Sequence, residues 1–191
     1  FLIFGTIKMQ KKYSEMIAMG IDPGLRNTGW GIISIVNNKI NYLGHGVIQT
    51  NPNKSEAERL YKISFEMKTI LKKYNPLIAY VESIFVSKNP SSALKLGMAR
   101  GVVLESVASH QISAKELSPR LVKKSITGSG NAGKDQVKYI IQKILMKNIL
   151  SDDASDALAI AIAGSYQVSL LENKIQNKLE FAIEKAKERQ K

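Results

Sequence analysis

The chain has 191 residues, of which 44% are hydrophobic and 23% charged, so it can bury the core of one folded domain. It contains no cysteine, which excludes disulfides, zinc–thiolate sites and thiol nucleophiles. Its net charge of +12 favours a polyanionic partner, with a basic but inert surface as the alternative.

Residues 1–15 run from an apolar patch into three lysines. No basic segment precedes the patch and no small-residue cleavage site follows it, so it makes a poor signal peptide. We leave this N-terminal extension out of the fold. No apolar run approaches the roughly 20 residues of a membrane span, so we expect a cytoplasmic protein with no membrane partner.

The first predicted elements are three antiparallel strands over residues 17–22, 30–36 and 40–49. A Pro-Gly turn follows the first strand, and Asn37-Asn38 supplies the second turn. The first strand stops at Asp22, where the sheet opens to solvent. Such a strand end is a favoured place for a ligand or metal, although Asp before Pro is also ordinary turn chemistry.

Alternating helices and strands follow. Apolar spacing predicts a helix over 55–74, then a strand over 77–81 that is apolar throughout and ends on Glu82. Asn89-Pro90 begins a helix reaching about His110 that is apolar around most of its girth, so it should be buried or pack against a partner.

The remaining elements are a short strand over 112–114, a short helix from Ser118-Pro119, a helix over 134–146 and a last helix capped by Ser151. Together the elements predict an α/β fold, a mixed five-stranded sheet with helices on both faces, over residues 16–168. Residues 169–191 form a basic, helix-prone tail whose composition is compatible with disorder.

Four carboxylates stand at element ends: Asp22, Glu82, Asp153 and Asp156. The last two are three residues apart and share one helix face. If the strands ending at Asp22 and Glu82 are neighbours, all four can converge. Like charges would then destabilise a bare cluster, and oxygen-only ligands favour Mg²⁺ or Mn²⁺. Two such ions support phosphodiester hydrolysis. Taken singly, these acids equally suit a solvated strand end or a helix dipole.

Basic residues gather over 115–138. They are Lys115, Arg120, Lys123, Lys124, Lys134 and Lys138. We expect some to contact phosphates, although any one could belong to a solvated face. The glycine-rich loop 128–133 nearly matches a nucleotide-binding loop but fails at Asp135, where a hydroxyl should hold Mg²⁺. Phe85, just past Glu82, could stack on a base or enter the core. We interpret His45 and His110 as structural.

Four segments carry a resemblance to a known family: Gly-Ile-Asp-Pro-Gly at 20–24, Val-Glu-Ser-Ile-Phe at 81–85, Ser-Ala-Leu-Lys-Leu-Gly-Met-Ala-Arg-Gly at 92–101, and Asp-Ala-Ser-Asp-Ala-Leu-Ala-Ile-Ala at 153–161. In this order they resemble the RuvC crossover-junction endodeoxyribonucleases, from about residue 16 to 167. The block at 92–101 is the most specific.

The resemblance implies a ribonuclease H-like fold, a homodimer, and Mg²⁺-dependent symmetrical nicking of four-way DNA junctions. It places Asp22, Glu82, Asp153 and Asp156 on the family's catalytic positions. It matches Lys123 and Lys134 to lysines near the scissile DNA and Phe85 to an aromatic that contacts junction bases. We group Arg120 and Lys124 with these DNA-binding residues. The implied partners are the branch-migration proteins RuvA and RuvB.

Three alternatives remain open at this stage. An actin-like or sugar-kinase domain also places an acid and glycines after its first strand, but it needs a longer chain. A RuvX-type ribonuclease H-like protein has a similar first turn but lacks the 92–101 block. A DNA-binding protein without catalysis would not need the full set of acids.

Overall fold

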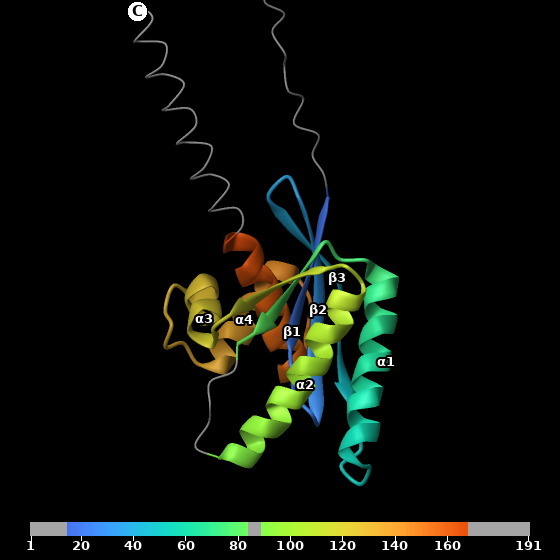
Figure 1. Ribbon diagram of the computed structural model, residues 1–191. Helices are drawn as coiled ribbons and strands as arrows, with labels where there is room; N and C mark the ends of the chain where they lie inside the picture. Colours follow the sequence, from blue (N-terminus) through green and yellow to red (C-terminus); the bar gives the residue numbers. More distant parts are fainter. Residues whose placement is uncertain (1–14, 84–88, 168–191) are drawn as a thin grey trace, which may run out of the picture.

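A computed structural model describes residues 15–83 and 89–167. Its centre is a five-stranded sheet in the order β3-β2-β1-β4-β5 (Figure 1). The strands are β1 (Met16–Asp22), β2 (Asn27–Val36), β3 (Lys39–Gln49), β4 (Ile78–Glu82) and β5 (Ser113–Leu117). The first three form an antiparallel meander, and β4 and β5 run parallel to β1. The predicted mixed sheet is confirmed.

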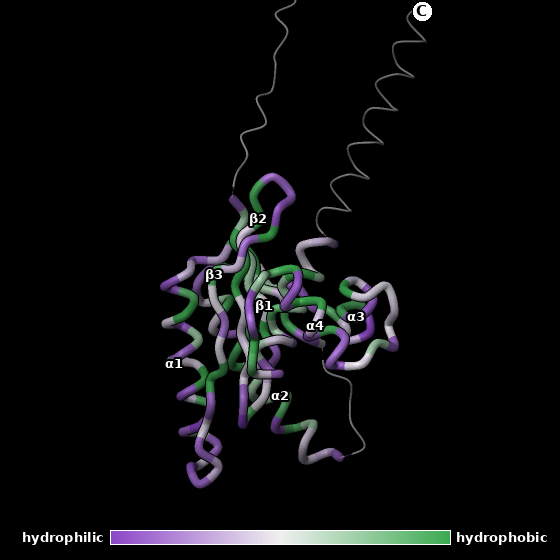
Figure 2. The backbone as a smooth tube through the Cα atoms, turned by 180° about the vertical axis from the view of Figure 1, so that it is seen from behind, coloured by the Kyte–Doolittle hydropathy of each residue, from purple (hydrophilic) through white to green (hydrophobic). Residues whose placement is uncertain are grey.

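Helices cover both faces of the sheet, also as predicted. One face carries α1 (Glu56–Tyr74) and α2 (Pro90–Ser109), and the other carries α3 (Pro119–Thr127), α4 (Lys134–Leu145) and a last helix over 152–167. Figure 2 shows the apolar residues concentrated toward the sheet between these layers. None of the helices in the described ranges combines the length and hydrophobicity needed to cross a bilayer.

The side-chain alternation of β1 and β4 decides where their terminal acids point. In β1, Met19 and Ile21 pack in the core beneath α1 and α2, whereas Ala18 packs in the core beneath the last helix. In β4, Val81 likewise packs beneath α1 and α2, whereas Tyr80 packs on the face of the last helix. Since side chains alternate along a strand, the residues after Ile21 and Val81 belong to the face of the last helix.

Glycines let the last helix approach this sheet closely. A Cβ added at Gly20 would lie 2.0 Å from the carbonyl oxygen of Ala157, and one at Gly29 would lie 2.0 Å from that of Asp153. Real side chains could not fit at either position without moving the helix backbone. These two glycines therefore bring the start of the helix directly against β1 and β2.

Two strands differ in extent from the predictions, since β2 begins at Asn27 rather than at residue 30. Strand β5 extends to Leu117 rather than ending at residue 114, because parallel pairing with β4 continues to the end of both strands. Its solvent-facing Ser-Ala-Lys-Glu run carries no apolar signal that would have revealed this pairing. Helix α2 buries Ala99, Val103 and Val107 but leaves Leu94 exposed, so part of its apolar surface is uncovered.

Some predictions lie outside the described residues. They concern Phe85, most of the N-terminal extension 1–15 and the tail 169–191.

Candidate active site

Neighbouring strand ends bring the first two acids together. Parallel pairing joins Ile21 to Val81, so Asp22 and Glu82 follow at adjacent positions on the same face. Both side chains line the same hollow. The structure confirms the prediction that these two strand ends are neighbours in the sheet.

The last helix adds the other two acids. Ser151 caps it, accepting a hydrogen bond from the backbone N–H of Ala154 at 3.4 Å. Asp156 lines the same hollow as Asp22 and Glu82. Asp153 lies on the side of β2, where the side-chain amide of Asn27 donates to its Oδ2 at 3.0 Å. The helix face thus delivers both carboxylates to the open end of β1.

The hollow at this point has a volume of about 340 Å³. Its polar lining is Asp22, Glu82, Lys123, Lys134 and Asp156, and its apolar lining comes from Pro119, Val122, Val137, Ala159 and Ile160. Acids enter from the sheet and the last helix, whereas lysines enter from α3 and α4. Negative and positive groups therefore share one opening, as a site for a phosphate and a cation requires.

Burial and mutual repulsion perturb the acids strongly. The pKa of Asp22 is raised to about 8, mainly by burial and then by the negative charges of Glu82, Asp156 and Asp153. Burial is also the main reason that the pKa of Glu82 is raised, followed by the charge of Asp156. At neutral pH without a cation, Asp22 therefore holds a proton.

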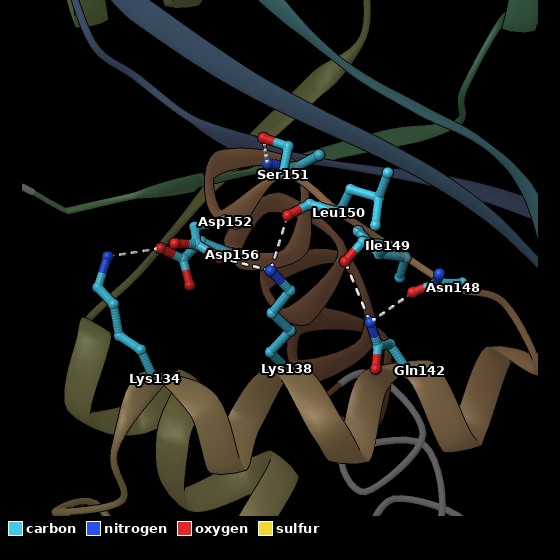
Figure 3. Close-up of polar contacts among 10 residues, drawn as sticks. Lys134, Lys138, Gln142, Asn148, Ile149, Leu150, Ser151, Asp152 and Asp156 are labelled. Atoms are coloured by element: carbon cyan, nitrogen blue, oxygen red, sulfur yellow. Dashed lines mark hydrogen bonds and ion pairs between the residues drawn. The ribbon is translucent and has the colours of Figure 1, made fainter.

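Lys134 partly compensates the negative charge. Its Nζ lies 2.9 Å from Oδ2 of Asp156. Figure 3 marks this contact with a dashed line. That hydrogen bond is the main reason that the pKa of Lys134 is raised. The lysine acts as an internal counter-ion for Asp156.

The donor set fits a hard divalent cation, since it consists of carboxylate oxygens whose mutual repulsion a cation would relieve. In the ranges 15–83 and 89–167, however, no three Asp, Glu or His side chains are arranged to coordinate one metal ion together. Asp156 is turned to Lys134 and Asp153 to Asn27, which accounts for this arrangement.

The remaining predicted residues fall in different places. Lys123 lines the acidic hollow. Arg120 and Lys124 line a separate hollow of about 500 Å³ on the other side of α3, bordered by the loop 128–131. Helix α3, not a strand, precedes that loop, which excludes a nucleotide-binding P-loop. Lys138 is held by Asp152 and the backbone of Leu150.

Both histidines have structural partners, as predicted. His45 Nδ1 lies 2.8 Å from the hydroxyl of Tyr42, and His110 Nδ1 lies 2.9 Å from the carbonyl oxygen of Ser106. The contact of Asn27 with Asp153 was not predicted. The two residues are 126 positions apart, and nothing in their local sequence signals the pairing.

The comparisons with known proteins agree with this geometry. The family model described as crossover junction endodeoxyribonuclease RuvC matches residues 18–164. The chain belongs to the RuvC family. The RuvC protein of Ehrlichia canis is 45% identical over 130 residues, which cover 68% of this chain and 83% of that protein. The RuvC protein of Rhodospirillum rubrum is 43% identical over 130 residues, covering 68% and 77%.

A solved structure extends the RuvC match to the fold. The structure described as T. thermophilus RuvC in complex with Holliday junction substrate superposes with a TM-score of 0.77 at 28% identity, covering 81% of this chain and 96% of that one. The ribonuclease H-like architecture implied by the resemblance is therefore confirmed. RuvC membership also decides against the actin-like and RuvX-type alternatives.

Proposed function

We propose that the four clustered carboxylates are the catalytic centre of this RuvC protein, and that they bind divalent metal. As a member of its family the chain is a crossover junction endodeoxyribonuclease, a phosphodiester hydrolase that resolves Holliday junctions in recombination and repair. The observation that supports the assignment is that Asp22, Glu82 and Asp156 line one hollow with two lysines, while the charge of Asp153 also helps to raise the pKa of Asp22 to about 8.

The metal-binding role falls to Asp22, Glu82, Asp153 and Asp156. They would hold Mg²⁺, with Mn²⁺ as a substitute and two ions per site, which when bound supply the Lewis acidity for in-line phosphodiester hydrolysis. Asp22 must first give up the proton that it holds in the metal-free protein. Lys134 must release Asp156, which frees its ammonium group for DNA.

The basic residues around the hollow bind the DNA backbone. Lys123 and Lys134 lie close enough to the acids to contact the phosphates next to the scissile bond. Arg120 and Lys124, on the far side of α3, contact the backbone further out. These contacts orient the junction without reading its sequence.

Phe85 is the candidate for holding the junction open, although it lies outside the described residues. An aromatic side chain soon after Glu82 can stack on an unpaired base at the strained junction centre, worth roughly 1–3 kcal/mol. Phe85→Ala should then slow cleavage of a fully paired junction more than it weakens binding. A junction with unpaired central bases should restore part of the rate. A core role predicts instead a lower Tm and no such restoration.

The assembly we propose is a homodimer, because two opposed strands need two sites related by a two-fold axis. It would act with the branch-migration proteins RuvA and RuvB, as the family resemblance implies. A nuclease of chromosomal junctions works where that DNA is, so a cytoplasmic location stays our prediction.

The function is tested by incubating the protein with a synthetic four-way junction, a linear duplex of the same sequence, or ATP, each with and without Mg²⁺. We expect paired symmetrical nicks in the junction only with Mg²⁺, and no comparable cleavage of the duplex or hydrolysis of ATP. Equal cleavage of the duplex, or cleavage that chelators do not stop, would contradict the proposal.

A further inference from the structure

Lys138 on α4 ties down the residues that lead into the last helix. Its Nζ donates to the carbonyl oxygen of Leu150 at 2.7 Å and to Oδ1 of Asp152 at 2.6 Å (Figure 3). The side chain of Lys138 is only 25% exposed, whereas that of Asp152 is 72% exposed. The lysine therefore reaches from the flank of α4 to the first turn of the neighbouring helix.

Gln142 extends the same attachment by one helical turn. Its Nε2 donates to the carbonyl oxygen of Ile149 at 3.1 Å and to Oδ1 of Asn148 at 3.2 Å. The connection 148–152 is thus fixed to α4 by two side chains on one face of that helix.

This attachment matters because the connection ends at the acids of the active site. Ile149 is buried, but Leu150 is 81% exposed and gives the following turn little packing support. The capping hydrogen bond from the backbone N–H of Ala154 to Oγ of Ser151 is long, at 3.4 Å. Lys138 supplies the shortest contacts between α4 and the start of the helix that carries Asp153 and Asp156.

We propose that Lys138 is a positioning residue for the carboxylate cluster, an inference that rests on the proposed function. By holding the Leu150 carbonyl it fixes the first turn of the last helix relative to the strand ends. By pairing with Asp152, the residue before Asp153, it holds the same turn through a second contact. Groups that orient metal ligands in this way typically contribute 10- to 100-fold to metal affinity or activity.

The competing role is a direct phosphate contact, since Lys138 belongs to the basic run 115–138. Two observations favour positioning. Its ammonium group already has two close acceptors within the protein, and Lys138 does not line the acidic hollow, whereas Lys134 does.

The test uses three substitutions on α4. Lys138→Met keeps the aliphatic length but removes the donors, Lys138→Arg keeps donors for both acceptors, and Lys143→Met is the matched control. Lys143 lies over the ring of Tyr139 on the same helix, 5.3 Å from its centroid. We expect Lys138→Met to raise the Mg²⁺ concentration at half-maximal cleavage roughly tenfold. Lys138→Arg should recover most of this loss, and Lys143→Met should show none.

Two further readouts separate positioning from other roles. The first is the Tm increase that Mg²⁺ causes in the DNA-free protein, which should shrink in Lys138→Met. The second is junction affinity in Ca²⁺ at several salt concentrations, which should keep its wild-type salt slope. A slope shallower by about one, with an unchanged Mg²⁺ requirement, would identify Lys138 as a phosphate contact and overturn the proposal.

Asp152→Asn provides a second route should Lys138→Met fold poorly, because Asp152 is exposed. It should weaken the Mg²⁺ response in the same direction but less, and the double variant should be no worse than Lys138→Met alone. Additive losses in the double variant would show that the two residues act independently. If wild-type protein cleaves no junction, the proposed function fails, while the Mg²⁺-dependent Tm still tests the positioning role.

Discussion

Asp22 is the residue at which function and stability conflict most directly. It is half-buried, lies near three other carboxylates, and has its pKa raised to about 8. The unfolded chain ionises the same group near 3.8. Between these two values the folded protein binds a proton that the unfolded chain does not, so its free energy of unfolding falls as pH rises. A bound cation would offset this penalty.

The first prediction is that metal-free protein loses stability between about pH 4 and pH 8 and that Asp22→Asn removes part of this loss. The variant should melt about 2–8 °C higher than wild type at pH 8, equivalent to about 1–2 kcal/mol. Thermal melts in EDTA across this range provide the measurement. In wild type, Mg²⁺ should stabilise more at pH 8 than at pH 6, and identical pH profiles for both proteins would contradict the account.

Lys123 and Lys134 act on the DNA side of the same site. The second prediction is that Lys123→Ala or Lys134→Ala lowers junction affinity and makes its salt dependence shallower by about one counter-ion. The measurement is binding at several salt concentrations in Ca²⁺. Lys62→Ala is the control, since Lys62 pairs with Glu66 on α1, on the opposite face of the sheet. Unchanged salt slopes for both variants would place these lysines away from the DNA.

The sequence predicts the acids better than it predicts their neighbours. Asp22 and Glu82 end apolar strands, and Asp153 and Asp156 are spaced three apart, so local pattern alone brings them into one hypothesis. The contacts of Asn27 and Lys138 depend on which helix lies beside which strand. That information is absent from any short segment.

At the scale of elements, the site exists because the last helix lies directly on the sheet. Gly20 and Gly29 permit this contact, which side chains at those positions would prevent. The helix is capped at Ser151 and fixed to α4 through Lys138. Its acids therefore depend on packing against three other elements.

The third prediction is that Gly29→Ala displaces the start of this helix. The added Cβ would meet the backbone of Asp153, so we expect a loss of about 1–3 kcal/mol in the free energy of unfolding and a larger fractional loss of cleavage than of folded protein. Gly133→Ala is the control, since nothing lies within 4 Å of its added Cβ. Denaturant melts and single-turnover cleavage measure both effects, and equal results for the two variants would refute the packing argument.

Helix α2 shows where sequence pattern reaches its limit. Its apolar girth predicts burial or a partner, and the structure buries only one side of it. Whether the other side is covered depends on a second chain, which no pattern within one chain can decide. The length of β5 is likewise set by pairing with β4 rather than by its own residues.

At the scale of the whole molecule, the number of active sites matters. The described residues of one chain hold one cluster of the four acids, whereas resolving a junction requires two nicks. The fourth prediction is that the protein dimerises through α2, where Leu94 is 66% exposed. Leu94→Glu should shift the mass toward the monomer and replace paired nicks by single ones. Analytical ultracentrifugation at micromolar concentration and a linear-product assay measure the two outcomes. A wild-type monomer with full resolving activity would rule out the dimer.

The central claim is that the four carboxylates act through bound metal, and conservative amide variants test it most directly. Asp22→Asn, Glu82→Gln, Asp153→Asn and Asp156→Asn each remove a charge while keeping the side-chain shape. Single-turnover cleavage of a four-way junction in Mg²⁺ should fall by at least about 100-fold in each, while binding in Ca²⁺ stays close to wild type because lysines dominate affinity. Near-normal cleavage by Asp22→Asn would contradict the account.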